Sequence, residues 1–220
     1  MKIKVAHLIA SGFGALLACS ASAEPMLQAH VGVDMWFGDS KINDIRREDE
    51  ALPSGYLTIE NQLPYLPHLR LRYTTFDTHY LSFDKYDLTF YYHVLEHDLM
   101  HFDAGIALLN FSDTQYRDGA TNQTNDFDKT AMTWFLAAEL NIPSTPADIL
   151  GEVSFSDNDG FKTTDFIAGV QYRIPTGENE LALRTGYRVI DLESSSKFSS
   201  SLGDDYVFID GWFLGMRYQF

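Results

Sequence analysis

The chain has 220 residues, 45% of them hydrophobic and 14% aromatic, and its formal net charge is −15. The apolar and aromatic content excludes a disordered acidic chain, which could not bury enough apolar surface to fold. The acidic excess also excludes nucleic acid as a partner, because a surface that binds nucleic acid must be positively charged to attract phosphates.

The N-terminus has the pattern of a secretory signal. A basic start at Met1 to Lys4 precedes an apolar stretch from Val5 to Ala18, and Ala21-Ser22-Ala23 supplies the small residues that a signal peptidase requires. We therefore expect a signal peptide over residues 1–23 and a mature domain over 24–220. Loss of Lys2 and Lys4 lowers the basic residues from 16 to 14 against 31 acidic ones, a formal charge of −17.

The chain contains one cysteine, Cys19, and it lies inside this signal. The mature domain is then without disulfides or thiol chemistry. The stretch Leu16 to Cys19 also loosely resembles a lipoprotein box, which would leave Cys19 acylated at a new N-terminus, and this alternative stays open.

Hydrophobic residues of the mature chain alternate with a period of two. In the first run, Leu27 to Phe37, the odd positions are apolar while Gln28, His30 and Asp34 lie on the opposite face. We expect about ten such strands, with eight as the alternative. The nine later runs are Tyr56–Leu63, His68–Phe76, Asp84–Leu95, Leu99–Phe111, Thr130–Ile142, Ile149–Ser156, Thr163–Ile174, Glu180–Asp191 and Tyr206–Phe220.

The connections alternate in length as well. Tight links follow the even strands, as in Pro64 to Pro67, whereas longer polar stretches follow most odd strands: Gly38–Gly55, Asp77–Phe83, Ser112–Lys129 and Leu192–Asp205. Short turns at one end and long loops at the other are typical of outer-membrane barrels. The sequence therefore predicts an all-β fold, a closed antiparallel up-and-down transmembrane β-barrel.

The polar faces of the strands carry a near balance of opposite charges. Enclosed charges must be paired, so we interpret these residues as a structural ion-pair network in a side-chain-filled lumen. The acids are Asp34, Glu60, Asp87, Asp103, Glu139, Glu152 and Asp165, and the arginines are Arg70, Arg72, Arg173, Arg184, Arg188 and Arg217.

Aromatic residues near the strand ends predict two interfacial girdles. One girdle is expected at the loop end and the other at the turn end. The first comprises Phe37, Tyr56, Phe111, Phe155, Tyr187, Tyr206 and Phe208, and the second Tyr92, Phe102, Tyr172, Tyr218 and Phe220.

The last run ends in the sequence GWFLGMRYQF, and its alternate residues are apolar. It resembles the C-terminal strand of Gram-negative outer-membrane proteins, which the barrel-assembly machinery recognises. The whole chain is similar to the small outer-membrane β-barrel families, and most similar to a functionally uncharacterised one. The residues that would form the assembly signal are Trp212, Leu214, Met216, Tyr218 and Phe220.

This resemblance implies export to the outer membrane of a Gram-negative bacterium. The expected partners are outer-membrane lipid, lipopolysaccharide and the barrel-assembly machinery, and the expected state is a monomer. We expect a structural or surface-interaction role without a catalytic, cofactor or metal site. A narrow porin-like channel is the alternative, and an outer-membrane hydrolase comes after it.

Three groups of residues have the composition of a catalytic or metal site. His79, beside Asp77 and near Asp84, has the composition of a general base at the rim. The residues Asp157-Asn158-Asp159-Gly160 resemble the start of a calcium loop, but without its downstream glutamate they favour a tight hairpin turn. The lumen-facing His30, His93 and His101 favour hydrogen-bonded core histidines over metal ligands.

Overall fold

The computed structural model describes residues 27–220 except 43–44, 64, 118–122, 195–197 and 199–205. The expected signal peptide, residues 1–23, and Cys19 lie outside the described residues. Within these ranges no helix is long and apolar enough to cross a membrane. The strands are β1 (Leu27–Ile42), β2 (Ile45–Asn61), β3 (His68–Asp77), β4 (Leu81–His97), β5 (Met100–Arg117), β6 (Thr124–Asn125), β7 (Lys129–Asn141), β8 (Ala147–Asn158), β9 (Phe161–Thr176), β10 (Asn179–Glu193) and β11 (Tyr206–Gln219).

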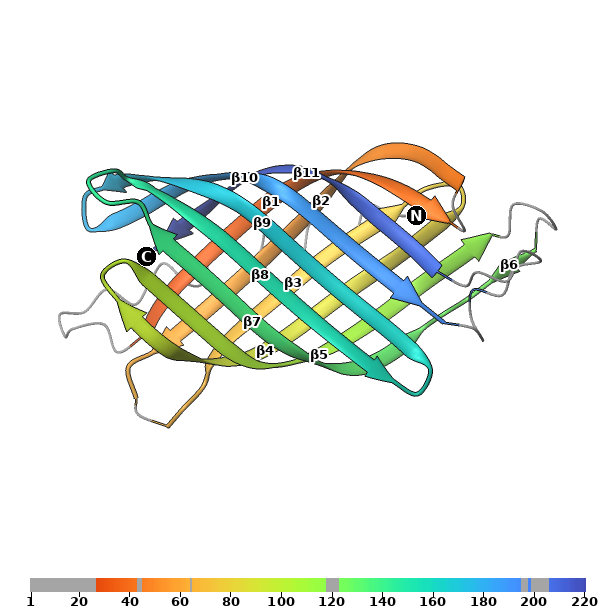
Figure 1. The fold of residues 1–220 in the computed structure, drawn as a ribbon, viewed down its shortest axis with the longest axis horizontal. Helices are drawn as coiled ribbons and strands as arrows, with labels where there is room; N and C mark the ends of the chain where they lie inside the picture. Colours follow the sequence, from red (N-terminus) through yellow and green to blue (C-terminus); the bar gives the residue numbers. More distant parts are fainter. Residues whose placement is uncertain (1–26, 43–44, 64, 118–122, 195–197, 199–205) are drawn as a thin grey trace.

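The strands form one closed antiparallel barrel. Each long strand pairs with its neighbour in sequence, β5 pairs with β7, and β1 pairs with β11 to close the sheet, while the two-residue β6 is attached to β5. The expectation of an up-and-down barrel of ten strands is therefore confirmed, and the alternative of eight is wrong. Figure 1 shows the strands wound obliquely around a long cylinder.

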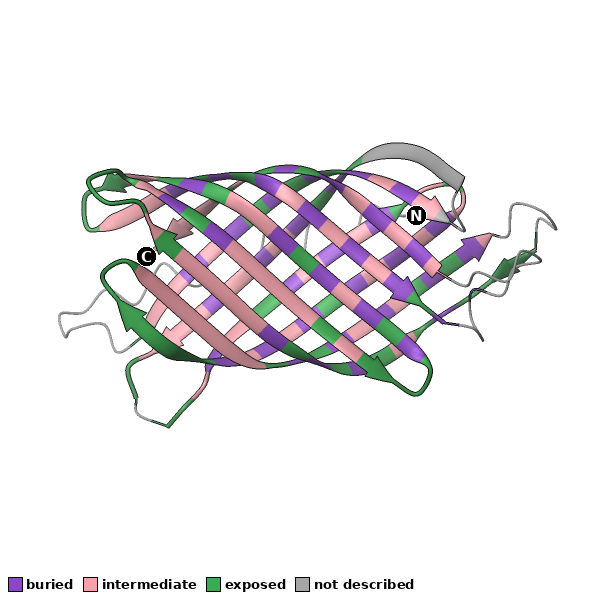
Figure 2. Cartoon of the chain, viewed as in Figure 1, coloured by how far each residue is buried: buried purple, intermediate pink, exposed green. Residues whose placement is uncertain are grey.

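Figure 2 shows that buried residues alternate with more exposed ones along many of the strands, because successive side chains point to opposite faces of the sheet. On β11 the outward Trp212 and Leu214 are 65% and 62% exposed, whereas the inward Phe213 between them is 3% exposed. The same alternation places Met216 outside and Arg217 inside the barrel. The apolar outer residues form the lipid-facing belt of the barrel.

The two ends of the barrel differ in their connections. At the turn end lie the short links after β2, β4, β7 and β9, and at the loop end lie the links after β1, β3, β5, β8 and β10. Residues Gly38–Gly55 were expected to be a loop, but β1 and β2 remain paired up to Ile42 and Ile45. The sequence of this extension is mainly polar, so it lacks the alternation of apolar residues that marks a membrane strand.

The β8–β9 connection is a two-residue hairpin turn, as expected. Asn158 pairs with Phe161, and the intervening Asp159 and Gly160 have φ values of +52° and +69°. Consecutive left-handed residues are what a type I′ hairpin requires, and Asp-Gly is a favoured pair for it. The turn geometry therefore explains this acidic stretch without a calcium ion.

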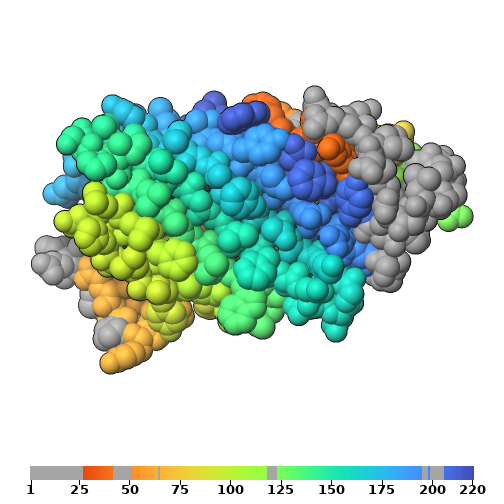
Figure 3. Space-filling model, in the orientation of Figure 1, coloured from red at the N-terminus to blue at the C-terminus, as the bar shows by residue number. Residues whose placement is uncertain are grey.

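Two residues assigned to the loop-end girdle lie inside the barrel. Tyr56 is 8% exposed and Phe111 is 1% exposed, because each has the parity of a lumen-facing neighbour, Glu60 on β2 and Asp103 on β5. Phe155 and Tyr172, in contrast, are exposed on the outer wall. In Figure 3 side chains of β7 to β10, coloured green to blue, cover one side of the barrel along its length.

Candidate functional site

The lumen is the candidate functional site, and its loop-end half is apolar. Inward side chains from β1–β5 and β8–β11 pack with Phe127 and Phe198 of the connecting segments into one buried cluster. Its rings contact one another closely: the Phe83 and Phe111 centroids are 5.3 Å apart, and those of Phe127 and Phe198 are 5.0 Å apart. Since Phe127 and Phe198 are 0% exposed, the described residues fill this half of the lumen with apolar side chains.

A buried ion-pair layer follows below this apolar core. Lys85 on β4 donates hydrogen bonds to Asp87 at 2.8 and 2.9 Å and to Asp165 on β9 at 2.7 Å. Arg188 on β10 holds the same Asp165 through Nε at 3.0 Å and Nη2 at 2.7 Å. Arg188 also donates to Thr74 at 3.1 Å. The layer contains equal numbers of cations and anions, so the charges neutralise one another away from water.

The next layer toward the turn end is built around Glu152 on β8. Arg70 and Arg72, which project from the same face of β3, both donate to this carboxylate, at 2.7 and 2.9 Å and at 2.5 and 3.1 Å. Paired N–H donors match the geometry of a carboxylate, which makes each of these contacts strong and directional. The Glu152 side chain is only 13% exposed, so this cluster joins β3 to β8 across the lumen.

Tyr56 lies between the arginines of two strands in the same layer. The Arg72 and Arg184 guanidinium carbons are 5.4 and 5.2 Å from its ring centroid, and Arg184 also donates a hydrogen bond to its hydroxyl. The ring lies against Gly32 on β1, where an added Cβ would collide with it. The glycine therefore provides the space that this side chain occupies.

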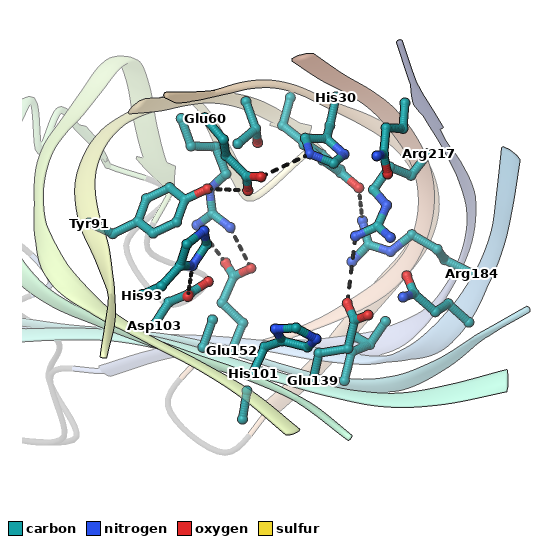
Figure 4. A pocket seen from close by; sticks show the side chains of 18 of the residues that line it. His30, Glu60, Tyr91, His93, His101, Asp103, Glu139, Glu152, Arg184 and Arg217 are labelled. Carbon is teal, nitrogen blue, oxygen red and sulfur yellow. Dashed lines mark hydrogen bonds and ion pairs between the residues drawn. The ribbon is translucent and has the colours of Figure 1, made fainter. Parts of the chain in front are cut away.

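A polar vestibule of about 500 Å³ opens at the turn end of the lumen. Figure 4 shows carboxylates, histidines and arginines around its wall. Glu60 lies 3.2 Å from His30 Nε2 and accepts a 2.8 Å hydrogen bond from Tyr91, and His93 Nδ1 lies 2.6 Å from Asp103.

Two arginines on the opposite strands of the vestibule lie farther from their carboxylate partners. Arg217 Nη atoms lie 3.6 Å from Glu139 and 3.8 Å from Glu180, distances too long for hydrogen bonds. Arg184 lies 3.7 Å from Asp34. These arginines therefore keep capacity to bind a further oxygen.

The structure places every expected network residue in the lumen. Those on the loop-end side of the vestibule form close pairs, and those near the turn end line the open space. The expected residues are Asp34, Glu60, Arg70, Arg72, Asp103, Glu139, Glu152, Asp165, Arg173, Arg184, Arg188 and Arg217. Their structural role stays a prediction.

Sequence reasoning missed three contributors to this network. Lys85 shares the parity of Asp87, and this parity indicates that its side chain points into the lumen. It was missed because lysine is rarely buried. Asp148, which pairs with Arg173 at 2.9 Å, lies one residue before the expected start of its strand. Tyr56 was placed in the outer girdle although its parity matches that of Glu60.

At the rim, His79 and Asp84 contact partners other than each other. His79 Nε2 lies 3.0 Å from Arg117, and Asp84 accepts a 2.8 Å hydrogen bond from Tyr73. Among the described residues there is no group of three or more histidine, cysteine or acidic side chains that could hold a metal ion.

No family model and no curated protein matches this chain. Among solved structures, the outer membrane protease OmpT from Escherichia coli is 10% identical with a TM-score of 0.47, covering 91% of this chain and 99% of its own. The β domain of the Bordetella autotransporter BrkA is 12% identical with a TM-score of 0.44, covering 86% and 98%. The CymD monoaromatic hydrocarbon channel is 8% identical with a TM-score of 0.33, covering 88% and 87%.

These similarities are too distant to transfer an activity. The class of this protein follows from its own features, an apolar outer wall, enclosed ion pairs and an antiparallel sheet that is closed by the pairing of β1 with β11. The chain is an outer-membrane β-barrel protein.

Proposed function

We propose that this protein is a non-catalytic barrel of the Gram-negative outer membrane whose lumen is closed to solutes at the loop end and open to the periplasm at the turn end. Its role is structural or surface-interacting. Short turns face the periplasm in outer-membrane barrels, so the vestibule faces that compartment. A further candidate, a narrow porin-like channel, has the polar vestibule of about 500 Å³ in its favour.

The apolar core of the loop half is the observation that carries this proposal. Phe83, Phe111 and Phe161 are at most 2% exposed, and the Phe111 ring centroid lies 5.3 Å from that of Phe83 and 6.0 Å from that of Phe161. An ion crossing this layer would lose its hydration shell without gaining a polar partner. The ion-pair layer beneath it adds a second barrier.

Single-channel recording in planar bilayers tests the closed lumen. We expect no conductance steps from the folded protein. The variant Phe83→Ala/Phe111→Ala/Phe161→Ala combined with Arg188→Ala removes the three rings and the side chain that joins β10 to Thr74 in the ion-pair layer, and it should conduct. The variant Trp134→Ala/Trp212→Ala on the outer wall should stay silent. Regular steps from the unaltered protein would overturn the closed barrel and support the porin-like channel.

The closing strand and the apolar belt bear on how the barrel is assembled and what surrounds it. The outward alternation of Trp212, Leu214 and Met216 at the closing strand supports recognition of this strand by the barrel-assembly machinery. Residues Tyr218 and Phe220 continue the pattern, and their rings contact each other at 4.9 Å. The apolar belt supports contact with outer-membrane lipid and lipopolysaccharide, and a monomer satisfies every sheet edge by itself.

A further inference from the structure

The charges of the vestibule change sign with depth. Near the turn end carboxylates outnumber arginines along the vestibule wall: the acids are Glu60, Glu96, Asp103, Glu139 and Glu180, and the arginines are Arg173 and Arg217. Deeper in the lumen arginines outnumber carboxylates, with Arg70, Arg72 and Arg184 around Glu152 and Asp34. We call these two zones the acidic mouth and the arginine floor.

The carboxylates of the acidic mouth are not held by permanent cations at bonding distance. The partners of Glu60 are His30 and Tyr91, and the partner of Asp103 is His93. None of these partners is an arginine or a lysine. Glu60 and Asp103 remain partly exposed, at 23% and 22% of their side chains, so an ammonium group in the vestibule can reach them.

The arginine floor is not saturated with anions. Arg70 and Arg72 share the single carboxylate of Glu152, and Arg184 is 3.7 Å from Asp34. The Nε atoms of Arg70, Arg72 and Arg184 have no hydrogen-bond partner within the described part of the chain. A carboxylate at this depth would meet guanidinium groups from two opposite strands, β3 and β10, a fork geometry that arginine provides.

We propose that the vestibule binds a small zwitterion of the peptide type, with its carboxylate on the arginine floor and its ammonium group at the acidic mouth. This inference rests on the proposed closed lumen, because a dead end holds one ligand in one orientation. The volume of about 500 Å³ lies within the range of small-molecule sites. A simple anion is repelled at the mouth and a simple cation at the floor, so both charges are needed.

Calorimetric titration of the folded barrel in a non-ionic detergent tests this selectivity. The probes are trialanine, N-acetyl-trialanine, which lacks the ammonium group, and trialanine amide, which lacks the carboxylate. We expect saturable binding of trialanine and about tenfold weaker binding of each capped peptide, as for the loss of one charge-assisted contact. Equal binding of either capped peptide, or no binding of trialanine, would overturn the proposal.

Variants assign each end of the ligand to its zone. In Glu60→Gln/Asp103→Asn the preference for trialanine over N-acetyl-trialanine should disappear, and in Arg70→Gln the preference over trialanine amide should shrink. The control Lys162→Gln removes an outer-wall cation whose side chain is 56% exposed, and it should change neither preference. Unchanged preferences in the lumen variants, with folding verified by the shift between unboiled and boiled samples on a detergent gel, would contradict the assignment.

The two proposals fail in different ways. A barrel that conducts but still discriminates among the three peptides contradicts only the closed lumen. A silent barrel that does not discriminate contradicts only the zwitterion site.

Discussion

The Glu152 cluster gives the sharpest test of the enclosed charge network. In Glu152→Gln, Arg70 and Arg72 keep a side chain of similar shape but lose their shared anion, and both arginines stay largely buried, at 12% and 3% side-chain exposure. Removing one partner of a buried ion pair typically costs about 3–5 kcal/mol, because the remaining charge is left uncompensated. We expect the free energy of unfolding to fall by this amount.

The assay is urea unfolding of the folded barrel in detergent, followed by intrinsic fluorescence and by gel mobility. The matched control is Glu193→Gln, which breaks the 3.0 Å Lys162–Glu193 pair on the outer surface and should leave the unfolding midpoint unchanged. The double variant Glu152→Gln/Arg72→Met should be less destabilised than Glu152→Gln alone. A midpoint for Glu152→Gln equal to that of the control would refute the claim that these charges are enclosed and mutually dependent.

Two further perturbations test local features of the barrel. Gly32→Val places a side chain where the Tyr56 ring lies, and we expect a loss of about 1–3 kcal/mol in urea unfolding together with disturbed Arg184 contacts; unchanged stability would mean that Tyr56 does not occupy this space. Gly160→Val forces a β-branched residue to a φ of +69° and should cost about 1–3 kcal/mol, whereas Asp159→Gly should be neutral or stabilising; the opposite order would contradict the two-residue turn.

The alternation of single strands was sufficient to predict the barrel. Trp212, Leu214 and Met216 alternate with Phe213, Gly215 and Arg217, and the closing pairing of β11 with β1 follows from this pattern and an even strand number. Lumen residues could be assigned because arginines and acids at one parity have no place in lipid. Their individual partners could not, since Arg70 and Glu152 are 82 residues apart and meet only across the closed barrel.

The apolar core of the loop half was not visible in the sequence. Its inward rings, such as Phe83 and Phe111, are of the same residue types as lipid-facing ones, and a bulge on β5 between Ser112 and Gln115 interrupts the parity of that strand. Phe127 and Phe198 come from polar connecting segments, in which a single aromatic residue gives no periodic signal. The apolar core of the loop half therefore depends on contacts between distant segments, which the periodicity of single strands does not reveal.

Thiol labelling of single cysteines tests the central claim, a turn-end vestibule sealed from the loop end, most directly. In a background with Cys19 replaced by serine, Ala137→Cys lies on the vestibule wall, and Ala107→Cys lies on β5 at a buried position that is 1% exposed. In proteoliposomes of defined orientation, a membrane-impermeant maleimide should label Ala137→Cys from the turn end alone and Ala107→Cys from neither end. Labelling of Ala137→Cys from the loop end would contradict the account.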